Sequence, residues 1–422
     1  MNILMLAKKL LRLKTQRADR LFTYPRAEQE KYLDKLYCDK VEKVLDEDSF
    51  ESYEVRSYCQ YLAQRELDGK FISFLTECAS LFLYPFLLFK YRRNYSKVNR
   101  STYNFENIDE LADKSQGDSN KRAVYLVYDA DRSNFPHLLS KKYQTLIYEN
   151  YNNSSLSKSD WEYLKKINKL RRFSFAYKLK NMIKLAIYRE LLEYYGSDNI
   201  QAVVVCAEYS YTSSILTYYL KQKNIAHIDV MHGEKLYYMR DSFCKFTELY
   251  VWDEHYKELF KSLYVPEETI IVHNMTEGKW DTINNSTSDS DTINKEFKYC
   301  YYLANENEDE LRQVKKNLDF LTAKYAGRYK VRLHPRYSDF SLVSNIFDKE
   351  NIEKKGLDIA ASLESTEYAI SLYSTVLYQA YDQGVPIIID DLKNPNYYNI
   401  LKNLSYIILS KKHSLLSDLI NA

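Results

Sequence analysis

The sequence predicts an α/β protein with two successive parallel sheets and a helix-rich N-terminal extension. Three observations support this class. From residue 121 onward, short apolar runs alternate with helical stretches, as in chains that fold into parallel sheets covered by helices. A polar, low-complexity segment at 276–295 interrupts the alternation, which then restarts. We therefore expect a helical region over 1–120, a first lobe over 121–275, a linker over 276–295 and a second lobe over 296–422.

The predicted strands are short apolar runs bounded by polar residues, and the predicted helices lie between them. In the first lobe we expect strands at 123–130, 201–208, 226–234, 248–254 and 269–274, with one long helix over about 160–195. In the second lobe we expect strands at 299–304, 329–336, 367–371, 386–390 and 406–409. Helices are expected there at 306–325, 374–384 and 395–402.

The composition excludes several classes of protein. Of 422 residues, 45% are hydrophobic and 28% are charged, as in chains that bury a large core. Lys+Arg number 60 and Asp+Glu 58, so the net charge of +2 gives no global attraction to nucleic acid, and we expect no such partner. Only 8 glycines occur, without a GxGxxG or Walker A loop, which argues against P-loop nucleotide hydrolysis. Six scattered cysteines without a CxxC pair favour a reduced, cytoplasmic setting.

Two N-terminal segments have an amphipathic or apolar pattern. Ile3, Leu6, Leu10 and Leu13 fall at helical spacing among basic residues, which suits either a helix on an anionic membrane surface or one packed on the protein. The run 71–93 is long enough to resemble a membrane span, but a glutamate and a proline interrupt it and basic residues end it. We expect a buried helix or a peripheral contact with the inner membrane.

Residues that could bind an anion follow two strands of the second lobe. Ligands of parallel α/β sheets bind at the carboxyl ends of the strands. His334 and Arg336 follow the run that contains Arg332, and they offer donors for phosphate oxygens. Ser374 and Thr375 open the helix after the next strand, where hydroxyls, N–H groups and the helix dipole favour an anion. The alternatives are solvated arginines, a histidine that caps the sheet, and plain helix capping.

The loop Met-His-Gly-Glu follows a strand of the first lobe and carries candidates for acid–base chemistry. His232 and Glu234 could act as a general base or orient a substrate. Gly233 would let the backbone turn sharply or approach a ligand. A histidine that serves only the fold is the alternative.

Three further carboxylates end strands of the first lobe: Asp129, Asp131 and Glu208. Any of them could deprotonate an acceptor hydroxyl, or simply cap the loop that follows. Asp129 and Asp131 form a DxD pair, but no nucleotide-binding strands precede them, so we expect no obligatory metal. No GxSxG or HExxH motif occurs, and the seven histidines show no ligand spacing.

Three stretches resemble bacterial surface-polysaccharide glycosyltransferases of the GT-B type, which have two Rossmann-like lobes facing a cleft. VRLHPR at 331–336 is similar to the HP motif of sialyltransferases and polysialyltransferases. ISLYSTVLYQAYDQGVPIIID at 370–390 resembles their Ser/Thr motif and the equivalent region of CDP-glycerol-type polymer transferases. MHGEKL at 231–236, with the strand and helix at 247–263, resembles the His-Gly loop of the CDP-glycerol group.

The resemblance implies roles for individual residues. His334 would contact the phosphate of the donor nucleotide, and Ser374 and Thr375 would hold the same phosphate. In the sialyltransferase-like families an acid of the first lobe is the base, whereas in the CDP-glycerol group the His of the loop, here His232, has the central role. The acids that could act as the base of a sialyltransferase-like enzyme are Asp129, Asp131, Glu208 and Glu234.

We therefore expect a glycosyltransferase that moves a sugar from a nucleotide-activated donor, such as a CMP-sialic-acid-like one, to a capsule or other surface glycan. The acceptor would be a glycan or a lipid-linked glycan, no cofactor or obligatory metal is expected, and the enzyme would work in the cytoplasm or at the cytoplasmic face of the inner membrane. One alternative is a CDP-glycerol or alditol phosphotransferase of teichoic-acid-type polymers. The other is a non-catalytic two-lobed protein that binds a glycan or nucleotide.

Overall fold

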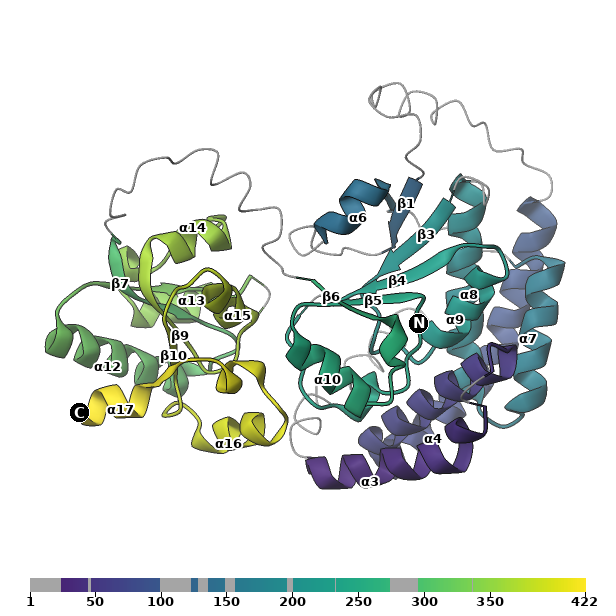
Figure 1. Ribbon diagram of the computed structural model, residues 1–422, viewed down its shortest axis with the longest axis horizontal. Helices are drawn as coiled ribbons and strands as arrows, with labels where there is room; N and C mark the ends of the chain where they lie inside the picture. The colour runs from purple at the N-terminus through teal and green to yellow at the C-terminus, as the bar shows by residue number, and fades with distance from the viewer. Residues whose placement is uncertain are drawn as a thin grey trace, which may run out of the picture. The chain divides into compact units, whose positions relative to one another are not determined.

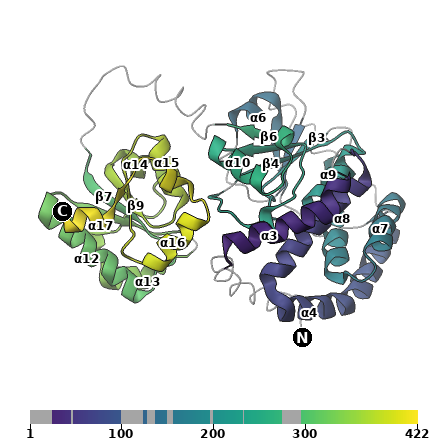
Figure 2. The same cartoon turned by 60° about the horizontal axis from the view of Figure 1, so that its bottom comes forward.

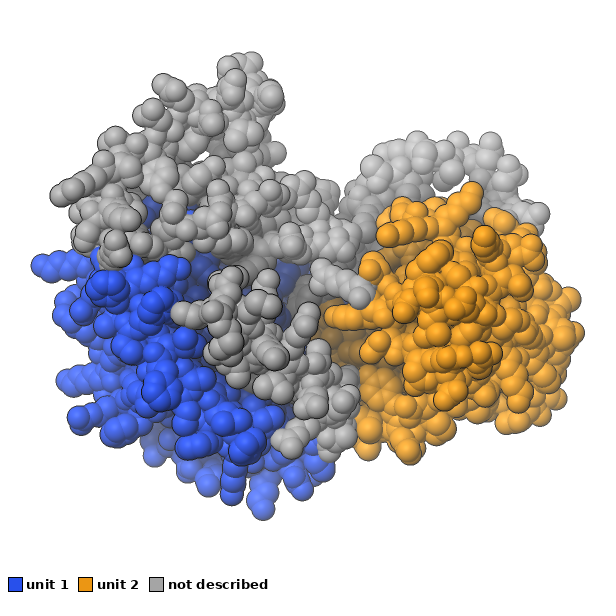
Figure 3. Space-filling view, turned by 180° about the vertical axis from the view of Figure 1, so that it is seen from behind, with its two compact units in different colours: residues 1–232, 238–274 blue, residues 233–237, 275–422 orange. Residues whose placement is uncertain are grey.

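The computed structural model describes residues 24–44, 47–98, 123–127, 136–148, 156–195, 200–231, 233–273, 295–335 and 337–422. The chain divides into two compact units, coloured separately in Figure 3. Unit 1 comprises Met1–His232 and Tyr238–Asn274, and unit 2 comprises Gly233–Tyr237 and Met275–Ala422. Each unit contains a parallel sheet with helices, so the α/β fold with two Rossmann-like lobes is confirmed.

Unit 1 is built on a sheet with the strand order β2-β1-β3-β4-β5-β6, in which every neighbouring pair is parallel. The central strands are apolar and buried on both sides, which explains their unbroken runs of valine and isoleucine. The strands are β1 (Ala123–Val127), β2 (Gln144–Tyr148), β3 (Ile200–Val205), β4 (Ala226–Val230), β5 (Glu248–Val251) and β6 (Ile270–Val272).

The helices of unit 1 include the N-terminal helical region, which is not set apart from the first lobe. The helix α4 contacts both α8 and α9, and Figures 1 and 2 show it farther from the sheet than α8. The helices are α3 (Arg26–Leu36), α4 (Phe50–Val98), α6 (His137–Lys142), α7 (Lys158–Leu170), α8 (Phe175–Tyr195), α9 (Ser213–Lys221) and α10 (Glu254–Ser262).

The long helix α4 bends at Gly69, whose φ of 75° and ψ of 161° are not helical. This combination is open almost exclusively to glycine, because a β-carbon would clash with the backbone. The bend lets the two halves of α4 contact each other: Tyr61 in the first half donates a hydrogen bond to Glu77 in the second. Gly69 thus turns a run of 49 residues into a helical hairpin that packs on unit 1.

Unit 2 is built on a second parallel sheet, with the strand order β11-β10-β9-β7-β8. Its strands are β7 (Phe297–Tyr302), β8 (Tyr329–Arg332), β9 (Thr366–Ser371), β10 (Ile387–Ile389) and β11 (Ser414–Leu415). Its helices are α12 (Glu308–Tyr325), α13 (Phe340–Ile346), α14 (Ile359–Glu364), α15 (Thr375–Asp382), α16 (Pro395–Asn403) and α17 (Leu416–Asn421).

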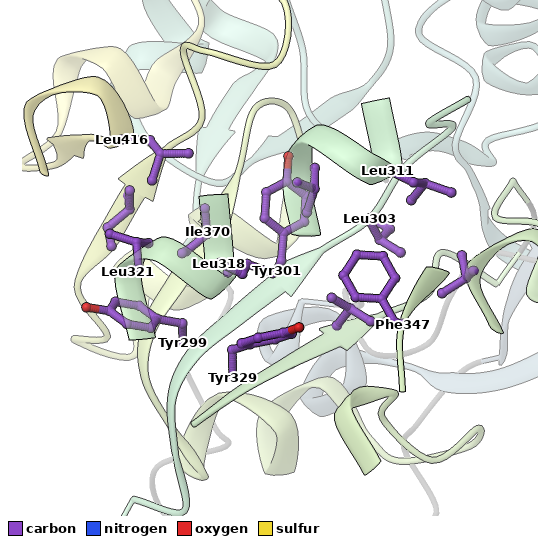
Figure 4. Close-up of a cluster of buried hydrophobic side chains, with 14 residues drawn as sticks. Tyr299, Tyr301, Leu303, Leu311, Leu318, Leu321, Tyr329, Phe347, Ile370 and Leu416 are labelled. Atoms are coloured by element: carbon purple, nitrogen blue, oxygen red, sulfur yellow. The ribbon is translucent and has the colours of Figure 1, made fainter. Parts of the chain in front are cut away.

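One core of unit 2 lies between this sheet and α12, as Figure 4 shows. Tyr299 and Tyr301 are two positions apart on β7, so their side chains lie on the same face of the sheet, toward α12. The helix contributes Leu311 and Leu318 from one of its faces. Asn307 caps the helix in a capping box with Glu310, so the N–E–D–E sequence itself marks where α12 begins. This packing fixes the ends of β7 and β8, which carry the candidate site.

Three expected elements differ from the structure. The run YIIL at 406–409 is not a strand: it lies in a 3₁₀ helix at Ile407–Ser410, and the last strand is Ser414–Leu415. Periodicity alone cannot separate the two because a short apolar run is buried in either form. The helix expected over 160–195 is two helices, α7 and α8, joined by a turn at 171–174. The strand β2 was not expected.

Candidate functional site

The carboxyl edge of the unit 2 sheet contains the point where the chain changes direction across the sheet. From β7 the chain passes to β8 on one side and then to β9 on the other. Ligands of doubly wound sheets bind outside the carboxyl ends of the strands at such a switch point. The segments that follow β7, β8 and β9 therefore form the candidate site, and the ends of β8 and β9 are about 10 Å apart because one strand separates them.

Ser374 and Thr375 lie at the start of α15, directly after β9. Ser374 is the N-cap, and its hydroxyl accepts a hydrogen bond from the Val376 N–H at 3.2 Å. Both side chains are partly exposed, as a ligand site requires. Plain N-capping therefore does occur, but the helix start also presents first-turn N–H groups and the positive end of the helix dipole at the switch point.

The segment Gly233–Tyr237 lies beside this helix start within unit 2, although the chain reaches it directly from β4 of unit 1. The Glu234 N–H donates to the Thr375 hydroxyl at 3.4 Å, and the Tyr237 N–H donates to the Leu404 carbonyl at 2.7 Å. Tyr237 is buried. The segment Gly233–Tyr237 and the Ser/Thr helix start, which the sequence places in different lobes, are thus in direct contact within unit 2.

Tyr406 lies beneath the same helix start. Its hydroxyl oxygen accepts a weak hydrogen bond from the Ser374 N–H at 3.5 Å, and its ring packs edge-on against Tyr373. Burial, and then the charge of the nearby Glu234, raise the pKa of Tyr406 well above its usual value. The phenol is therefore neutral at physiological pH, and it places no charge under the helix start.

His334 lies in a compact turn after β8. The backbone N–H of His334 donates to the Ser338 hydroxyl at 2.9 Å, and that hydroxyl donates at 3.1 Å to the carbonyl of Ala304, which follows β7. The imidazole stacks on Tyr337, with 4.5 Å between ring centres. The turn thereby holds the partly exposed His334 side chain at the same sheet edge as Ser374 and Thr375.

Arg332, the third donor-binding candidate of this strand, has partners that belong to the fold. Its guanidinium binds Glu353 and donates to the Leu357 carbonyl at 2.7 Å. The same carboxylate binds the buried Lys330 at 2.6 Å. The structure therefore ties Arg332 to the segment that crosses back from β8, and we do not include it among the ligands of a donor.

Sequence reasoning missed a buried ion pair at this edge. Glu306, after β7, binds Lys393, after β10, at 2.6 Å, and their side chains are 2% and 9% exposed. The Ala304 N–H also donates to Glu306 at 2.7 Å. Glu306 could have been found from the sequence, because it lies just beyond an apolar run, as the other candidates do. No sequence pattern marks Lys393.

A second missed residue, Asp390, ends β10. It accepts hydrogen bonds from the Tyr301 hydroxyl at 2.8 Å and from the Lys393 N–H at 2.9 Å. Burial raises the pKa of Asp390, and these hydrogen bonds oppose that shift. Both missed groups are satisfied and buried, so we assign them to holding the strand ends in place.

Glu208, after β3 of unit 1, is fully buried. The first half of α4 covers it, because Gln60 donates to the carbonyls of Glu208 and Arg240 at 2.7 and 2.8 Å. Asp229, inside β4, is also fully buried and accepts a hydrogen bond from the Ala207 N–H at 2.6 Å. A carboxylate sealed under a helix cannot reach an acceptor hydroxyl, so we do not carry Glu208 forward as the base.

Four of the predicted site residues lie outside the part of the chain that the structure describes: Asp129, Asp131, His232 and Arg336. Most of the predicted linker lies outside it as well. Of the remaining site residues, the structure brings Glu234, Thr375 and Ser374 together and leaves Glu208 in the other unit. Within the described ranges, no group of three or more His, Cys, Asp or Glu is arranged to hold a metal ion.

The comparisons with known proteins give only distant structural likenesses. No protein-family model matches the sequence, and no curated protein matches it. The UDP-N-acetylglucosamine 2-epimerase from Rickettsia bellii is 12% identical and has a TM-score of 0.40, with 64% of this chain and 78% of that chain covered. A Methanocaldococcus jannaschii UDP-GlcNAc 2-epimerase is 16% identical and has a TM-score of 0.41, with 69% of this chain and 93% of that chain covered. The H548A variant of the wall teichoic acid polymerase TagF is 13% identical and has a TM-score of 0.42, with 82% of this chain and 87% of that chain covered. At such scores the likenesses carry no conclusion about what this chain binds.

Proposed function

We propose that this chain is a GT-B-type transferase that moves a sugar from a nucleotide-activated donor to a bacterial surface glycan. The observation that carries the proposal is the start of α15, where Ser374 and Thr375 lie at the switch point of the unit 2 sheet beside the segment Gly233–Tyr237. A helix N-terminus at such a place suits the phosphate of a nucleotide.

The donor chemistry follows from the charge that develops on the leaving group. As the bond to the sugar breaks, negative charge grows on the nucleotide phosphate. The dipole and first-turn N–H groups of α15, the hydroxyls of Ser374 and Thr375, and the imidazole of His334 would stabilise that charge. We propose that Arg336 adds to them and that no metal is required.

The acceptor hydroxyl must lose a proton during transfer, and a base of the first lobe would take it. We propose Asp131, with Asp129 as its neighbour, for this role. A lipid-linked glycan at the cytoplasmic face of the inner membrane is the acceptor that we favour. Glu234 is less suited to the role of base because its backbone is tied to Thr375, at the phosphate end of the site.

A CDP-alditol phosphotransferase is the second candidate, and one observation favours it. The segment Gly233–Tyr237, which directly follows His232 in the sequence, lies against the Ser/Thr helix start. For this reaction we therefore propose that His232 acts at the donor phosphate rather than at the acceptor. In that reaction the attack is on phosphorus, and a histidine at the phosphate would take the proton of the attacking hydroxyl.

The first experiment is thermal melting of the full chain with CMP, CDP, UDP or GDP, with and without EDTA. A ligand that binds only the folded state raises the melting temperature. We expect stabilisation by a cytidine nucleotide that persists in EDTA, disappears in His334→Ala and is retained in His413→Ala, a matched histidine of unit 2. Stabilisation by UDP or GDP instead would keep the transferase and replace the donor. No stabilisation by any nucleotide would contradict the proposal and favour a protein that binds glycans without catalysis.

The second experiment separates the two reactions in a surface-glycan assay. Loss of product in Asp131→Asn with activity retained in His232→Ala supports sugar transfer by an acidic base. The reverse result supports the phosphotransferase. Activity retained in both variants would contradict each mechanism and favour the binding protein.

A further inference from the structure

The second half of α4 exposes an apolar surface that no described residue covers. Five phenylalanines within nineteen residues of one helix are more than half exposed, so packing against the described part of the protein does not explain them. We call this surface the phenylalanine face; its exposed fractions are Phe71 73%, Phe74 64%, Phe82 78%, Phe86 52% and Phe89 64%.

These phenylalanines lie on one side of the helix. With 3.6 residues per turn, their directions fall within an arc of about 120° around the helix axis. Leu75 and Leu81, also exposed, extend the same surface. The pattern is therefore amphipathic in an unusual sense, because the apolar side faces solvent and the polar side faces the protein.

The opposite side of this helix packs on unit 1. Glu77 accepts a hydrogen bond from the Ala176 N–H at the start of α8, at 3.1 Å. Ser80 is buried, and the Tyr84 hydroxyl donates to the Asn168 side chain of α7 at 3.2 Å. The glutamate that interrupts the apolar run in the sequence thus points away from the phenylalanine face, and that face carries no charge.

The same packing decides between a span and a surface helix. By length and composition alone, the helix over Phe50–Arg92 could cross a membrane. Crossing would carry the attached Glu77, Asn168 and the start of α8 into the hydrocarbon, where polar groups are costly. A helix that lies in the interface plane buries only its exposed side and leaves those contacts in place.

Basic residues lie at both ends of the phenylalanine face. Lys70 precedes Phe71, and Lys90 and Arg92 follow Phe89, all three being exposed. Acidic side chains are absent from the exposed side of the helix between them. An apolar strip with positive charges at its ends is complementary to a bilayer that carries anionic headgroups.

We propose that the phenylalanine face docks the protein on an anionic lipid surface, with the α4 axis parallel to the membrane plane. The rings enter the boundary between headgroups and acyl chains, and the flanking lysines and arginine bind the headgroup phosphates. This surface belongs to unit 1 and shares no residue with the nucleotide site of unit 2, so either proposal can fail without the other.

The test is flotation of the full chain with vesicles of phosphatidylcholine, with or without added phosphatidylglycerol. We expect the protein to float with the anionic vesicles and far less with the neutral ones. The combined variant Phe74→Ser, Phe82→Ser and Phe86→Ser should lower the partition coefficient by about tenfold or more. Because all three rings are exposed, its melting temperature should stay at the parent value, which shows that the fold is kept.

Two further variants control the comparison. Phe340→Ser removes a phenylalanine of unit 2 that is 66% exposed, and it should bind vesicles as the parent does. Lys70→Gln with Lys90→Gln should remove most of the preference for anionic vesicles. Unchanged flotation of the serine variant would overturn the proposal. So would a parent that ignores vesicles but forms a dimer in sedimentation that the serine variant does not form, because the face would then bind a second copy.

Discussion

At the scale of single residues, His227 shows how a histidine can serve the fold alone. It is fully buried, with its Nε2 2.8 Å from the Tyr188 hydroxyl and its Nδ1 2.7 Å from that of Thr217. Thr217 already donates to the Ser213 carbonyl, so it accepts from the imidazole and Nδ1 carries the proton. Burial, and then the charge of Lys184, lower the pKa of His227 to about 3.

This shift predicts a pH dependence of stability. In the unfolded chain the pKa of a histidine is about 6.5, so acid protonates the unfolded state first. The contribution of His227 is complete above that value and is lost as the pH falls toward 3. Between pH 7 and pH 5, we expect the free energy of unfolding of the parent to fall by about 2 kcal/mol more than that of His227→Gln, as measured by urea unfolding. Equal losses in the two proteins would contradict this assignment.

Gly233 offers a test of the proposed nucleotide site that leaves the fold intact. Gly233 lies at a bend of the chain, in keeping with the sharp turn expected there. A β-carbon at Gly233 would meet nothing within 4 Å. The second role expected of this glycine is the close approach of a ligand, and the open space beside it allows that test. Gly233→Ala should keep the melting temperature of the parent but lose most of the stabilisation by nucleotide.

Gly384→Ala is the contrasting variant, because Gly384 has a φ of 71° at the end of α15. It should melt at a lower temperature and respond to nucleotide as the parent does. A Gly233→Ala protein that responds fully would show that no ligand approaches this backbone.

The candidate residues could be predicted from sequence only in part. The position of His334, Ser374 and Thr375 at one sheet edge could be predicted, because in a parallel sheet the residues that follow the strands lie at the same edge. The contact between Glu234 and Thr375 could not be found, because 141 positions separate them and the linear pattern assigns them to different lobes. The role of Arg332 also escaped the sequence, since Glu353 comes from a segment without periodicity.

At the scale of elements, α4 combines a run that resembles a membrane span with the contacts of a soluble helix. Its first half is largely buried and seals Glu208, whereas its second half exposes phenylalanine. The two halves differ because the bend at Gly69 turns the chain back. Hydropathy alone treats both halves as one pattern, so only the backbone geometry separates them.

Gly69→Ala should therefore destabilise unit 1. A non-glycine residue at this φ and ψ costs about 1–3 kcal/mol, which is more than the gain in helix propensity from alanine. The measurement is the free energy of unfolding in urea, followed by circular dichroism. Ala79→Gly, in the helical part of α4, is the comparison and should cost about 1 kcal/mol. A more stable Gly69→Ala protein would contradict the strain.

The strands were the most predictable elements, because buried parallel strands are continuous apolar runs. Most expected strands of both sheets are confirmed, with shorter bounds. The error at 406–409 arose where a left-handed Ser405, with φ of 61°, turns the chain before the apolar run. Such a turn needs no glycine or proline, and the sequence therefore contained no sign of it.

At the scale of the whole molecule, the division into units does not follow the order of the chain. Unit 1 is interrupted by Gly233–Tyr237, which belongs to unit 2. Lys235, Leu236 and Tyr237 are buried, and the backbone of Tyr237 is bonded to Leu404. The chain thus passes between the units three times, twice around this short segment and once at the linker.

This arrangement predicts the result of cutting the linker. If a protease site is inserted within 276–294, cleavage should leave the two fragments together in size-exclusion chromatography, because Gly233–Tyr237 remains held in unit 2. Adding Leu236→Ala and Tyr237→Ala, which remove two buried side chains, should let the fragments separate. Separation of the unmodified fragments would mean that the segment holds unit 2 too weakly to join them.

The three passages also limit how such a protein can diversify. A lobe that is one continuous piece of chain can be exchanged by a single recombination event and bring a new donor preference with it. Here a crossover within the linker would import a foreign second lobe but leave the ancestral Gly233–Tyr237 to pack against it. If the proposed donor site is correct, its preference should therefore change by substitutions that accumulate together at both places, and not by the exchange of a whole module.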